Sequence, residues 1–95
     1  MGGRRNSMTV SSAPTVTVRV LLFASYAEAL GQASLTLVVP APATVAGVLQ
    51  VLRHHPGGEH LPERPLCAVN LEQARLDSPV KAGDEVAVLP PLAGG

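Results

Sequence analysis

The chain has 95 residues, with seven basic and seven acidic side chains, so its formal net charge at pH 7 is zero. This length suffices for one domain with a single modest core, and a neutral chain with one Phe and one Tyr lacks the basic surface or stacking rings that nucleic-acid binding needs. Thirteen valines, thirteen leucines and no tryptophan form a core of small side chains, which argues against a broad apolar ligand cavity.

The first fourteen residues, MGGRRNSMTVSSAP, show no hydrophobic periodicity and are predicted to be a disordered leader. Its two arginines are not followed by an apolar block, so the segment does not have the form of a secretory signal. No run approaches the roughly 18 apolar residues of a membrane span. A single cysteine, Cys67, excludes an intramolecular disulfide. We therefore expect a cytoplasmic protein with neither a nucleic acid nor a membrane as its partner.

The segment TVTVRVLLF alternates apolar and polar side chains and then becomes apolar on both sides. Val16, Val18 and Val20 share one face, which predicts a strand that is half exposed at its start and buried further along. ASYAEAL consists of helix formers followed by Gly31, and predicts a turn or a short helix. ASLTLVVP alternates again and closes at Pro40, which predicts a second strand antiparallel to the first.

The segment ATVAGVLQVLRHHPGG predicts the main helix of the chain. The spacing i, i+3, i+4, i+7 that marks the apolar face of a helix is occupied by Val45, Val48, Leu49 and Leu52. Thr44 is the expected N-cap, and Pro56 with Gly57 ends the helix. Gly47 lies inside it at a conformational cost, for which close packing on a sheet is the expected reason.

Short segments follow the loop GGEHLPERP. LCAVN predicts a short strand, and LEQARLDSPV predicts a hairpin arm near 74–76. KAGD fits a type II turn with Gly83 at the position that needs positive φ, and EVAVL predicts the last strand. Pro90 and Pro91 cannot donate ladder hydrogen bonds, so they favour an extended exit.

This order of elements predicts an α+β fold, in which one main helix packs across a mixed sheet of four to five strands. The first and last strands are the most apolar, so we expect them to lie side by side and parallel at the sheet centre. That arrangement is the β-grasp, the ubiquitin-like fold. The predicted organisation is a disordered leader at 1–14, a β-grasp domain at 15–89 and a flexible, extended diglycine tail at 90–95.

Four segments carry a resemblance to a known family: VRVLLFASYAEALG, ATVAGVLQVL, CAVN and VKAGDEVAVLPPLAGG. They are similar to the MoaD group of ubiquitin-like sulfur carriers, the MoaD/ThiS type, which includes the small subunit of molybdopterin synthase. The resemblance runs from about Val16 to Gly95. Its most specific part is the end, where Gly-Asp-Glu, an apolar strand and Pro-Pro precede Gly-Gly. The chain has Leu-Ala before the diglycine, where many members carry Val-Ser.

The resemblance implies a function for the terminal carboxylate. An ATP-using activating enzyme of the MoeB type adenylates Gly95, and a sulfur donor of the cysteine desulfurase or rhodanese type converts it to a thiocarboxylate (1-thioglycine). The tail then enters the large subunit, MoaE, and donates sulfur to cyclic pyranopterin monophosphate in molybdenum cofactor biosynthesis. The implied synthase is a heterotetramer with two copies of each subunit. By this resemblance the chain is expected to bind no cofactor of its own and to catalyse nothing alone, since it serves as a cosubstrate.

The residue types of the tail suit this chemistry. Gly94 and Gly95 have no Cβ, so an enzyme channel can close on the backbone beside the reacting carbonyl. The two prolines hold the base of the tail extended, which lowers the entropy lost on insertion. Partner contacts are expected along the tail, from Pro90, Pro91, Leu92 and Ala93. Phe23 and Leu89 are expected at a hydrophobic docking patch, the resemblance placing Phe23 near the large-subunit interface, and core packing is the alternative for both.

Other functions share the same terminus. A carrier for thiamin thiazole or for cysteine synthesis would end in the same way, although thiazole carriers are shorter and lack a segment like Glu-Ala-Leu-Gly. A ubiquitin-like modifier joined to lysines of target proteins would use the same activated carboxylate. Sequence alone leaves these alternatives open.

The remaining polar groups point to structural roles. The run RHHPGGEH places His54, His55, Glu59 and His60 in a pattern that matches no standard metal site, and we expect a solvated loop with no metal. Cys67 lies among apolar residues and is expected to be a buried small hydrophobe rather than a sulfur-relay thiol. The charges of Lys81, Asp84 and Glu85 are expected to belong to a turn and a strand edge.

Overall fold

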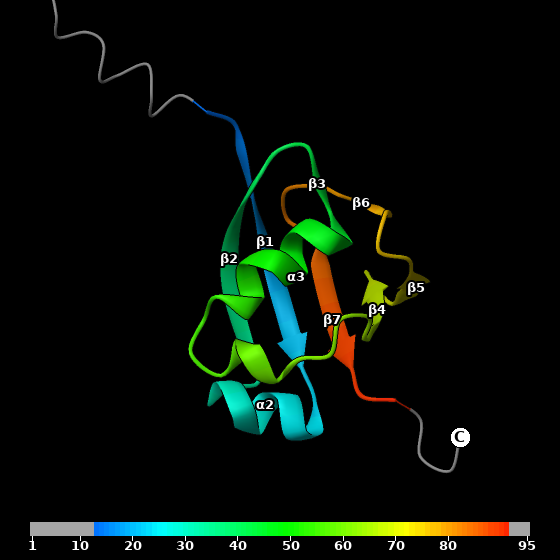
Figure 1. Ribbon diagram of the computed structural model, residues 1–95. Helices are drawn as coiled ribbons and strands as arrows, with labels where there is room; N and C mark the ends of the chain where they lie inside the picture. Colours follow the sequence, from blue (N-terminus) through cyan, green and yellow to red (C-terminus); the bar gives the residue numbers. More distant parts are fainter. Residues whose placement is uncertain (1–12, 92–95) are drawn as a thin grey trace, which may run out of the picture.

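The computed structural model of the protein describes residues 13–91. Residues 1–12 of the predicted leader and the tail residues 92–95 lie outside this range, so what the sequence predicts for them stays a prediction. Figure 1 shows a sheet with one helix packed across it and a second helix at its lower end. The elements in chain order are β1 (Thr15–Leu22), α2 (Ala24–Leu30), β2 (Ser34–Pro40), β3 (Ala43–Thr44), α3 (Val45–Arg53), η1 (Gly58–His60), β4 (Leu66–Val69), β5 (Glu72–Ala74), β6 (Pro79–Val80) and β7 (Glu85–Leu89).

The main sheet has five strands in the order β2-β1-β7-β4-β5. β1 and β7 are parallel neighbours, with Leu22 opposite Val88, and every other pairing in the sheet is antiparallel. The prediction that the first and last strands lie parallel near the centre is confirmed, as is the antiparallel pairing of β1 with β2. The β-grasp prediction is therefore confirmed.

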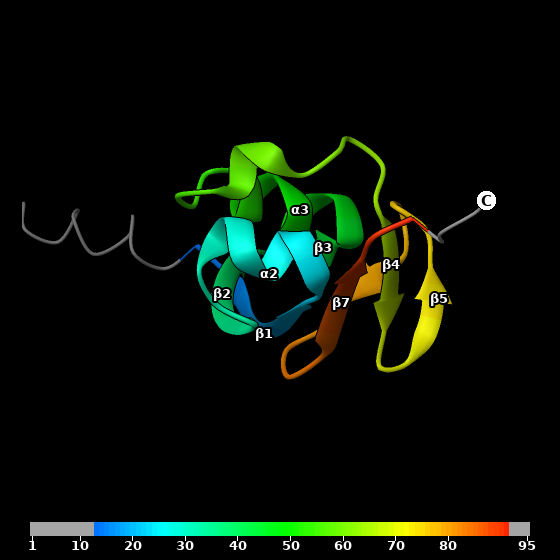
Figure 2. The same ribbon diagram turned by 90° about the horizontal axis from the view of Figure 1, so that it is seen from below.

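The core lies between the sheet and α3. Alternate residues of the central strands point toward this helix, and Figure 2 shows both helices on the same side of the sheet. The predicted apolar face of α3 is fully buried. It packs against the inward-facing side chains of the sheet, which are Val18, Val20, Leu37, Val86 and Val88. Burying such aliphatic side chains stabilises the fold by about 1.5–3 kcal/mol each.

Capping explains where the two helices begin and end. Thr44 precedes α3 in an extended conformation, and its hydroxyl oxygen accepts a hydrogen bond from the Gly47 N–H at 3.2 Å, as predicted. Gly31 ends α2 with φ of 77°. The expectation that Gly47 serves close packing is wrong. A Cβ built there would lie 3.8 Å from its two nearest neighbours, Thr44 Oγ1 and Val39 Cγ1, which is ordinary contact.

The C-terminal half departs from prediction in one strand. The hairpin arm is β5, Glu72–Ala74, rather than 74–76, because a two-residue turn at Asn70 and Leu71 starts the return strand earlier. Both turn residues have positive φ, 51° and 74°, the pattern of a type I′ hairpin. The predicted turn with Gly83 at positive φ is present, at 86°. The small sheet of β3 and β6 was not predicted, because strands of two residues show no periodicity.

In residues 13–91, no helix is both long enough and apolar enough to span a bilayer.

Candidate docking surface and tail exit

The C-terminal tail leaves the domain at one edge of the sheet. β1 and β7 are parallel, so their carboxyl ends lie at the same edge, where α2 follows β1 and Pro90 follows β7 (Figure 1). The last described residue, Pro91, is exposed. The predicted site residues Leu92, Ala93, Gly94 and Gly95 lie outside the described residues.

Two of the predicted docking residues come together beside this exit. Leu22 pairs with Val88, so the next residues along each strand, Phe23 and Leu89, reach the same level of the sheet. Phe23 has extended dihedrals, φ −127° and ψ 152°, so its side chain lies on the face opposite to Leu22, away from α3. It is 43% exposed, which rules out core packing as its role, whereas Leu89 is half-buried.

The same face carries a shallow apolar hollow of about 330 Å³ beside Leu89. Leu66 lies directly opposite Leu89 across the β4–β7 ladder. The hollow is lined by Leu66, Cys67, Ala68, Leu71, Gln73 and Leu89. We call the set Phe23, Leu66, Ala68, Leu71 and Leu89 the tail-side surface. Exposed apolar groups gathered in this way mark an interaction site more often than scattered ones do.

Leu71 is the most unusual member of this surface. It is 89% exposed, although it is a large apolar residue, and its φ of 74° lies in the left-handed region that leucine disfavours. Sequence reasoning missed both Leu66 and Leu71. The available signal was an apolar residue directly after Asn70, at a position where a hairpin turn usually takes glycine.

Cys67 faces the core rather than the outer face. Its side chain is 2% exposed, and burial raises the pKa of the thiol to about 11, with Arg53 acting weakly in the opposite direction. The prediction of a buried small hydrophobe is confirmed. A thiol with this pKa is a poor nucleophile near neutral pH.

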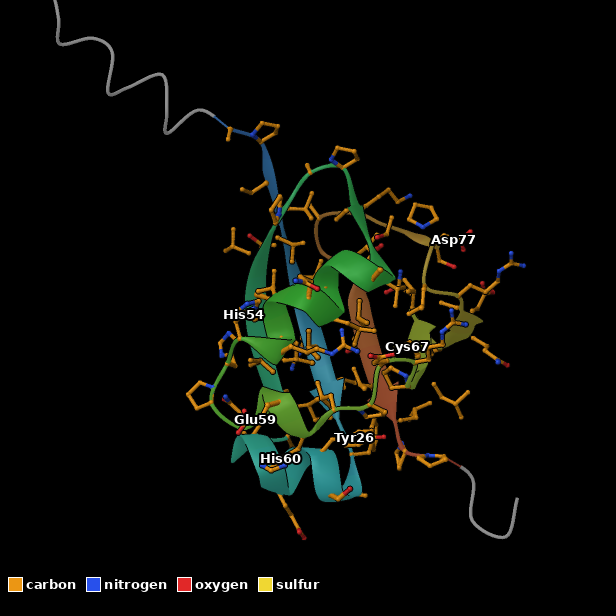
Figure 3. All side chains as sticks on the ribbon, viewed as in Figure 1. Tyr26, His54, Glu59, His60, Cys67 and Asp77 are labelled. Carbon is orange, nitrogen blue, oxygen red and sulfur yellow. The ribbon has the colours of Figure 1, made fainter. Side chains whose placement is uncertain are left out.

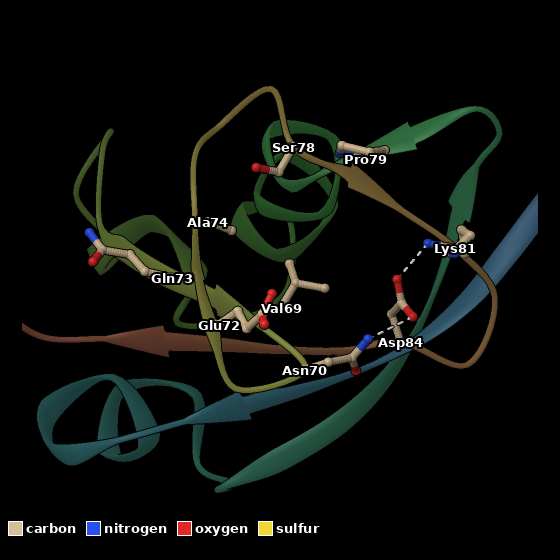
Figure 4. A pocket seen from close by; sticks show the side chains of 9 residues that line it. All are labelled: Val69, Asn70, Glu72, Gln73, Ala74, Ser78, Pro79, Lys81 and Asp84. Carbon is tan, nitrogen blue, oxygen red and sulfur yellow. Dashed lines mark hydrogen bonds between the residues drawn. The ribbon is translucent and has the colours of Figure 1, made fainter.

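The charged residues of the predicted turn form a hydrogen-bonded network (Figure 4). The Lys81 backbone N–H donates to Asp84 Oδ2 at 2.8 Å, and Asn70 Nδ2 donates to Asp84 Oδ1 at 3.0 Å. Asn70 Oδ1 in turn accepts from the Glu85 N–H at 3.0 Å. These bonds hold the pKa of Asp84 below its usual range. The network joins the β4–β5 hairpin to the start of β7, and so fixes the strands that carry the tail-side surface.

The structure does not bring the side chains of the histidine-rich segment together as a set of three ligands. His54 Nδ1 lies 2.8 Å from the Gln50 carbonyl oxygen, and His60 Nε2 lies 3.7 Å from Glu59 Oε2. Figure 3 shows His54 separated from Glu59 and His60. Among the residues that the structure describes, no three His, Cys, Asp or Glu side chains are placed to hold a metal ion.

The fold and the open tail exit define a ubiquitin-like β-grasp protein. The ThiS family model matches residues 20–95, so the chain belongs to the ThiS family. The molybdopterin synthase sulfur carrier subunit of Homo sapiens is 34% identical over 86 residues, covering 86% of this chain and 98% of that protein. The protein of the same name from Arabidopsis thaliana is 33% identical over 82 residues, 85% of each chain.

A solved structure adds a second kind of relative. The small archaeal modifier protein 1 of Haloferax volcanii superposes with a TM-score of 0.73 and 31% identity, covering 81% of this chain and 99% of that chain. The resemblance to the MoaD/ThiS type of ubiquitin-like sulfur carrier is therefore confirmed by sequence and by fold.

Proposed function

We propose that this chain is the sulfur carrier subunit of a molybdopterin synthase and that it carries sulfur as a thiocarboxylate on Gly95. The observation that supports this most directly is the position of the tail exit. β7 delivers Pro90 and Pro91 to the border of an exposed apolar surface, so one partner can hold the body and receive the tail. The similarity to two curated carrier subunits over most of their length supports the same function.

The proposed chemistry begins at the terminal carboxylate, which is ionised at neutral pH and a poor electrophile. On a MoeB-type activating enzyme, a carboxylate oxygen attacks the α-phosphorus of ATP, and pyrophosphate leaves. The terminal sulfur of a cysteine persulfide on a cysteine desulfurase or rhodanese type donor then attacks the acyl carbon, the bond to AMP breaks and an acyl disulfide forms. A second thiol attacks the donor's cysteine sulfur, so that the S–S bond breaks, a disulfide forms on the donor and the thiocarboxylate leaves. ATP is a substrate of the partner enzyme, and this chain holds no cofactor in the scheme.

The tail-side surface is the proposed contact with a MoaE-type large subunit, in a heterotetramer with two copies of each chain. From Pro91 to Gly95 the tail spans at most about 17 Å when extended, at roughly 3.3–3.6 Å per residue. That reach is enough for the terminal carbonyl to enter a buried site on a subunit that contacts Phe23 and Leu89. There it would donate its sulfur to cyclic pyranopterin monophosphate.

The carrier chemistry is tested by intact mass measurement after incubation with activating enzyme, ATP and a sulfide source. The native chain should gain about 16 Da, since one oxygen is replaced by sulfur. A chain with one residue added after Gly95, and the variant Gly95→Ala, should fail to form molybdopterin with the large subunit and precursor. Asp77→Ala, an exposed change on the α3 side of the sheet, is the matched control and should retain full transfer. Normal product formation by the extended chain would contradict the proposal.

The docking surface is tested by binding to the isolated large subunit. Phe23→Ala or Leu66→Ala should weaken the complex by about 10-fold or more, since burying a large apolar side chain is worth about 1.5–3 kcal/mol. Circular dichroism should show both variants folded, because neither residue is in the core. Unchanged affinity in both variants would place the interface elsewhere.

The similarity to an archaeal modifier protein supports a second candidate function, in which the activated Gly95 is joined to lysines of other proteins. The same terminus and tail exit would serve it. Isopeptide adducts found on lysines of cell proteins, together with no thiocarboxylate in the mass experiment, would favour the modifier. Transfer of sulfur to the pterin precursor would favour the synthase subunit over both the modifier and the thiazole or cysteine carriers.

A further inference from the structure

One exposed apolar residue is not part of the tail-side surface. The large apolar residues that are exposed in the described chain are Phe23, Val38, Leu66 and Leu71, and Val38, at 58% exposure, lies on β2. It pairs with Thr17, near the end of the sheet where β7 begins, whereas Leu89 lies where β7 ends. Val38 is therefore at the diagonally opposite corner of the sheet and calls for a separate explanation.

β2 is an edge strand whose outward backbone groups can be identified. The Arg19 N–H donates to Asp84 O, and the Thr17 carbonyl accepts from the Gly83 N–H, so these residues of β1 turn their backbone groups toward β7. Their antiparallel partners, Thr36 and Val38, consequently direct N–H and C=O groups away from β1. Within residues 13–91, no backbone or side-chain group is bonded to those of Thr36 and Val38 at this edge.

The edge also lacks the usual protection against pairing. Edge strands are commonly blocked by charged residues, by proline inside the strand or by shortness. β2 has seven residues, SLTLVVP, none charged, with its only proline at the last position. The opposite edge, β5, has three residues, of which Glu72 and Gln73 are polar and exposed. Figures 1 and 2 show β2 at the outer margin of the sheet, and no other strand of residues 13–91 lies beyond it.

We propose that β2 is a self-association edge, at which two copies of this chain pair β2 with β2 in antiparallel orientation and form one continuous sheet. When a two-fold axis relates the two copies, each outward N–H of β2 in one copy faces an outward C=O of β2 in the other, so this edge is complementary to itself. An uncharged strand meets its copy without like-charge repulsion. A register that sets Thr36 opposite Val38 of the second copy brings together two β-branched pairs on the exposed face.

The geometry leaves the tail free in such a dimer. The tail-side surface lies at the carboxyl end of β7, across the sheet from Val38, so each copy would still present its own exit to a partner. The inference does not depend on the proposed function, since it rests on the backbone groups and side chains of β2 alone.

Amide hydrogen exchange on the full chain tests the pairing residue by residue. In dilute solution the amides of Thr36 and Val38 should exchange rapidly, while those of Leu35 and Leu37, which face β1, are protected. Raising the protein concentration should slow exchange at these two outward amides and leave exchange at Leu35 and Leu37 unchanged. Protection that is independent of concentration and disappears when residues 1–12 are removed would overturn the proposal, because the edge would then be covered by the chain's own leader.

Sedimentation of variants provides the second measurement. Val38→Lys should raise the dissociation constant of the dimer by at least about 10-fold, because in the proposed register the two lysines lie at diagonal positions across the junction, where their like charges repel. Thr36→Pro should act likewise while keeping the fold, since the N–H it removes faces solvent in the monomer. Leu71→Ala, on the tail-side surface, is the control and should leave self-association unchanged. A chain that sediments as a monomer up to about 1 mM, or a dimer that only Leu71→Ala dissociates, would overturn the proposal.

Discussion

Replacing Leu71 by glycine should make the protein more stable and less able to dock. A left-handed backbone conformation costs an L-residue about 1–2 kcal/mol, and Leu71 has φ of 74°. Glycine gives up about 0.5–1 kcal/mol through its greater freedom in the unfolded chain. The side chain is 89% exposed, so its removal loses only about 0.2 kcal/mol of burial. The net expectation is a gain of about 0.5 kcal/mol, or roughly 2–4 °C in the midpoint of thermal unfolding.

The same change should weaken binding to the large subunit by about 10-fold or more, because an exposed leucine buried on docking contributes about 1.5–3 kcal/mol. Leu71→Ala separates the two effects. Alanine removes the apolar side chain but keeps the cost of positive φ, so it should lose affinity without gaining stability.

Urea unfolding followed by circular dichroism measures the stability of the three proteins, and titration calorimetry with the large subunit measures affinity. Higher stability and lower affinity together would mean that the left-handed conformation at Leu71 destabilises the fold and that the Leu71 side chain contributes to binding a partner. A Leu71→Gly protein that is less stable than the native chain would refute the energetic argument, and one that binds with native affinity would remove Leu71 from the docking surface.

Three further results are expected. Gly47→Ala should raise the free energy of unfolding by about 1 kcal/mol, since the new methyl group meets only ordinary contacts. Gly57→Ala should lower the free energy of unfolding by more than about 2 kcal/mol, because its Cβ would collide with the Ala29 carbonyl. Equal effects of the two variants in urea unfolding would contradict both expectations. The Lys81 backbone bond, aided by Asn70, lowers the folded pKa of Asp84 from 3.8, so its contribution to stability is present in full above that pH and lost as pH falls through the folded value. The Asp84→Asn variant should therefore be less stable at pH 7, and its free energy of unfolding should fall less steeply as the pH is lowered. An unchanged dependence of stability on acid pH would count against the network. Cys67, with a pKa of about 11, should resist iodoacetamide at pH 8 until urea unfolds the chain, and rapid labelling of native protein would show that it is not buried.

The sequence by itself determined the layers of this protein. Alternation in Thr15–Leu22 and in Ser34–Pro40, and the helical spacing of Val45–Arg53, are local patterns that hold only when one face is buried, and so they identified the inner face of each element. The caps at Thr44 and Gly31 were predictable for the same reason, because each depends on hydrogen bonds or dihedral angles within a few residues. The family resemblance added the significance of the terminal diglycine.

Only the tertiary structure decided which outward-facing residues lie together. Phe23 is far along the chain from Leu66 and Leu71, and all three become neighbours of the tail exit through the β4–β7 pairing and the parallel alignment of β1 with β7. Outward positions carry no burial signal, because water accepts almost any side chain there, so their grouping depends on strand order and register. The free edge of β2 is hidden from sequence for the same reason, since whether a strand is central or at an edge depends on neighbours that are distant in the chain.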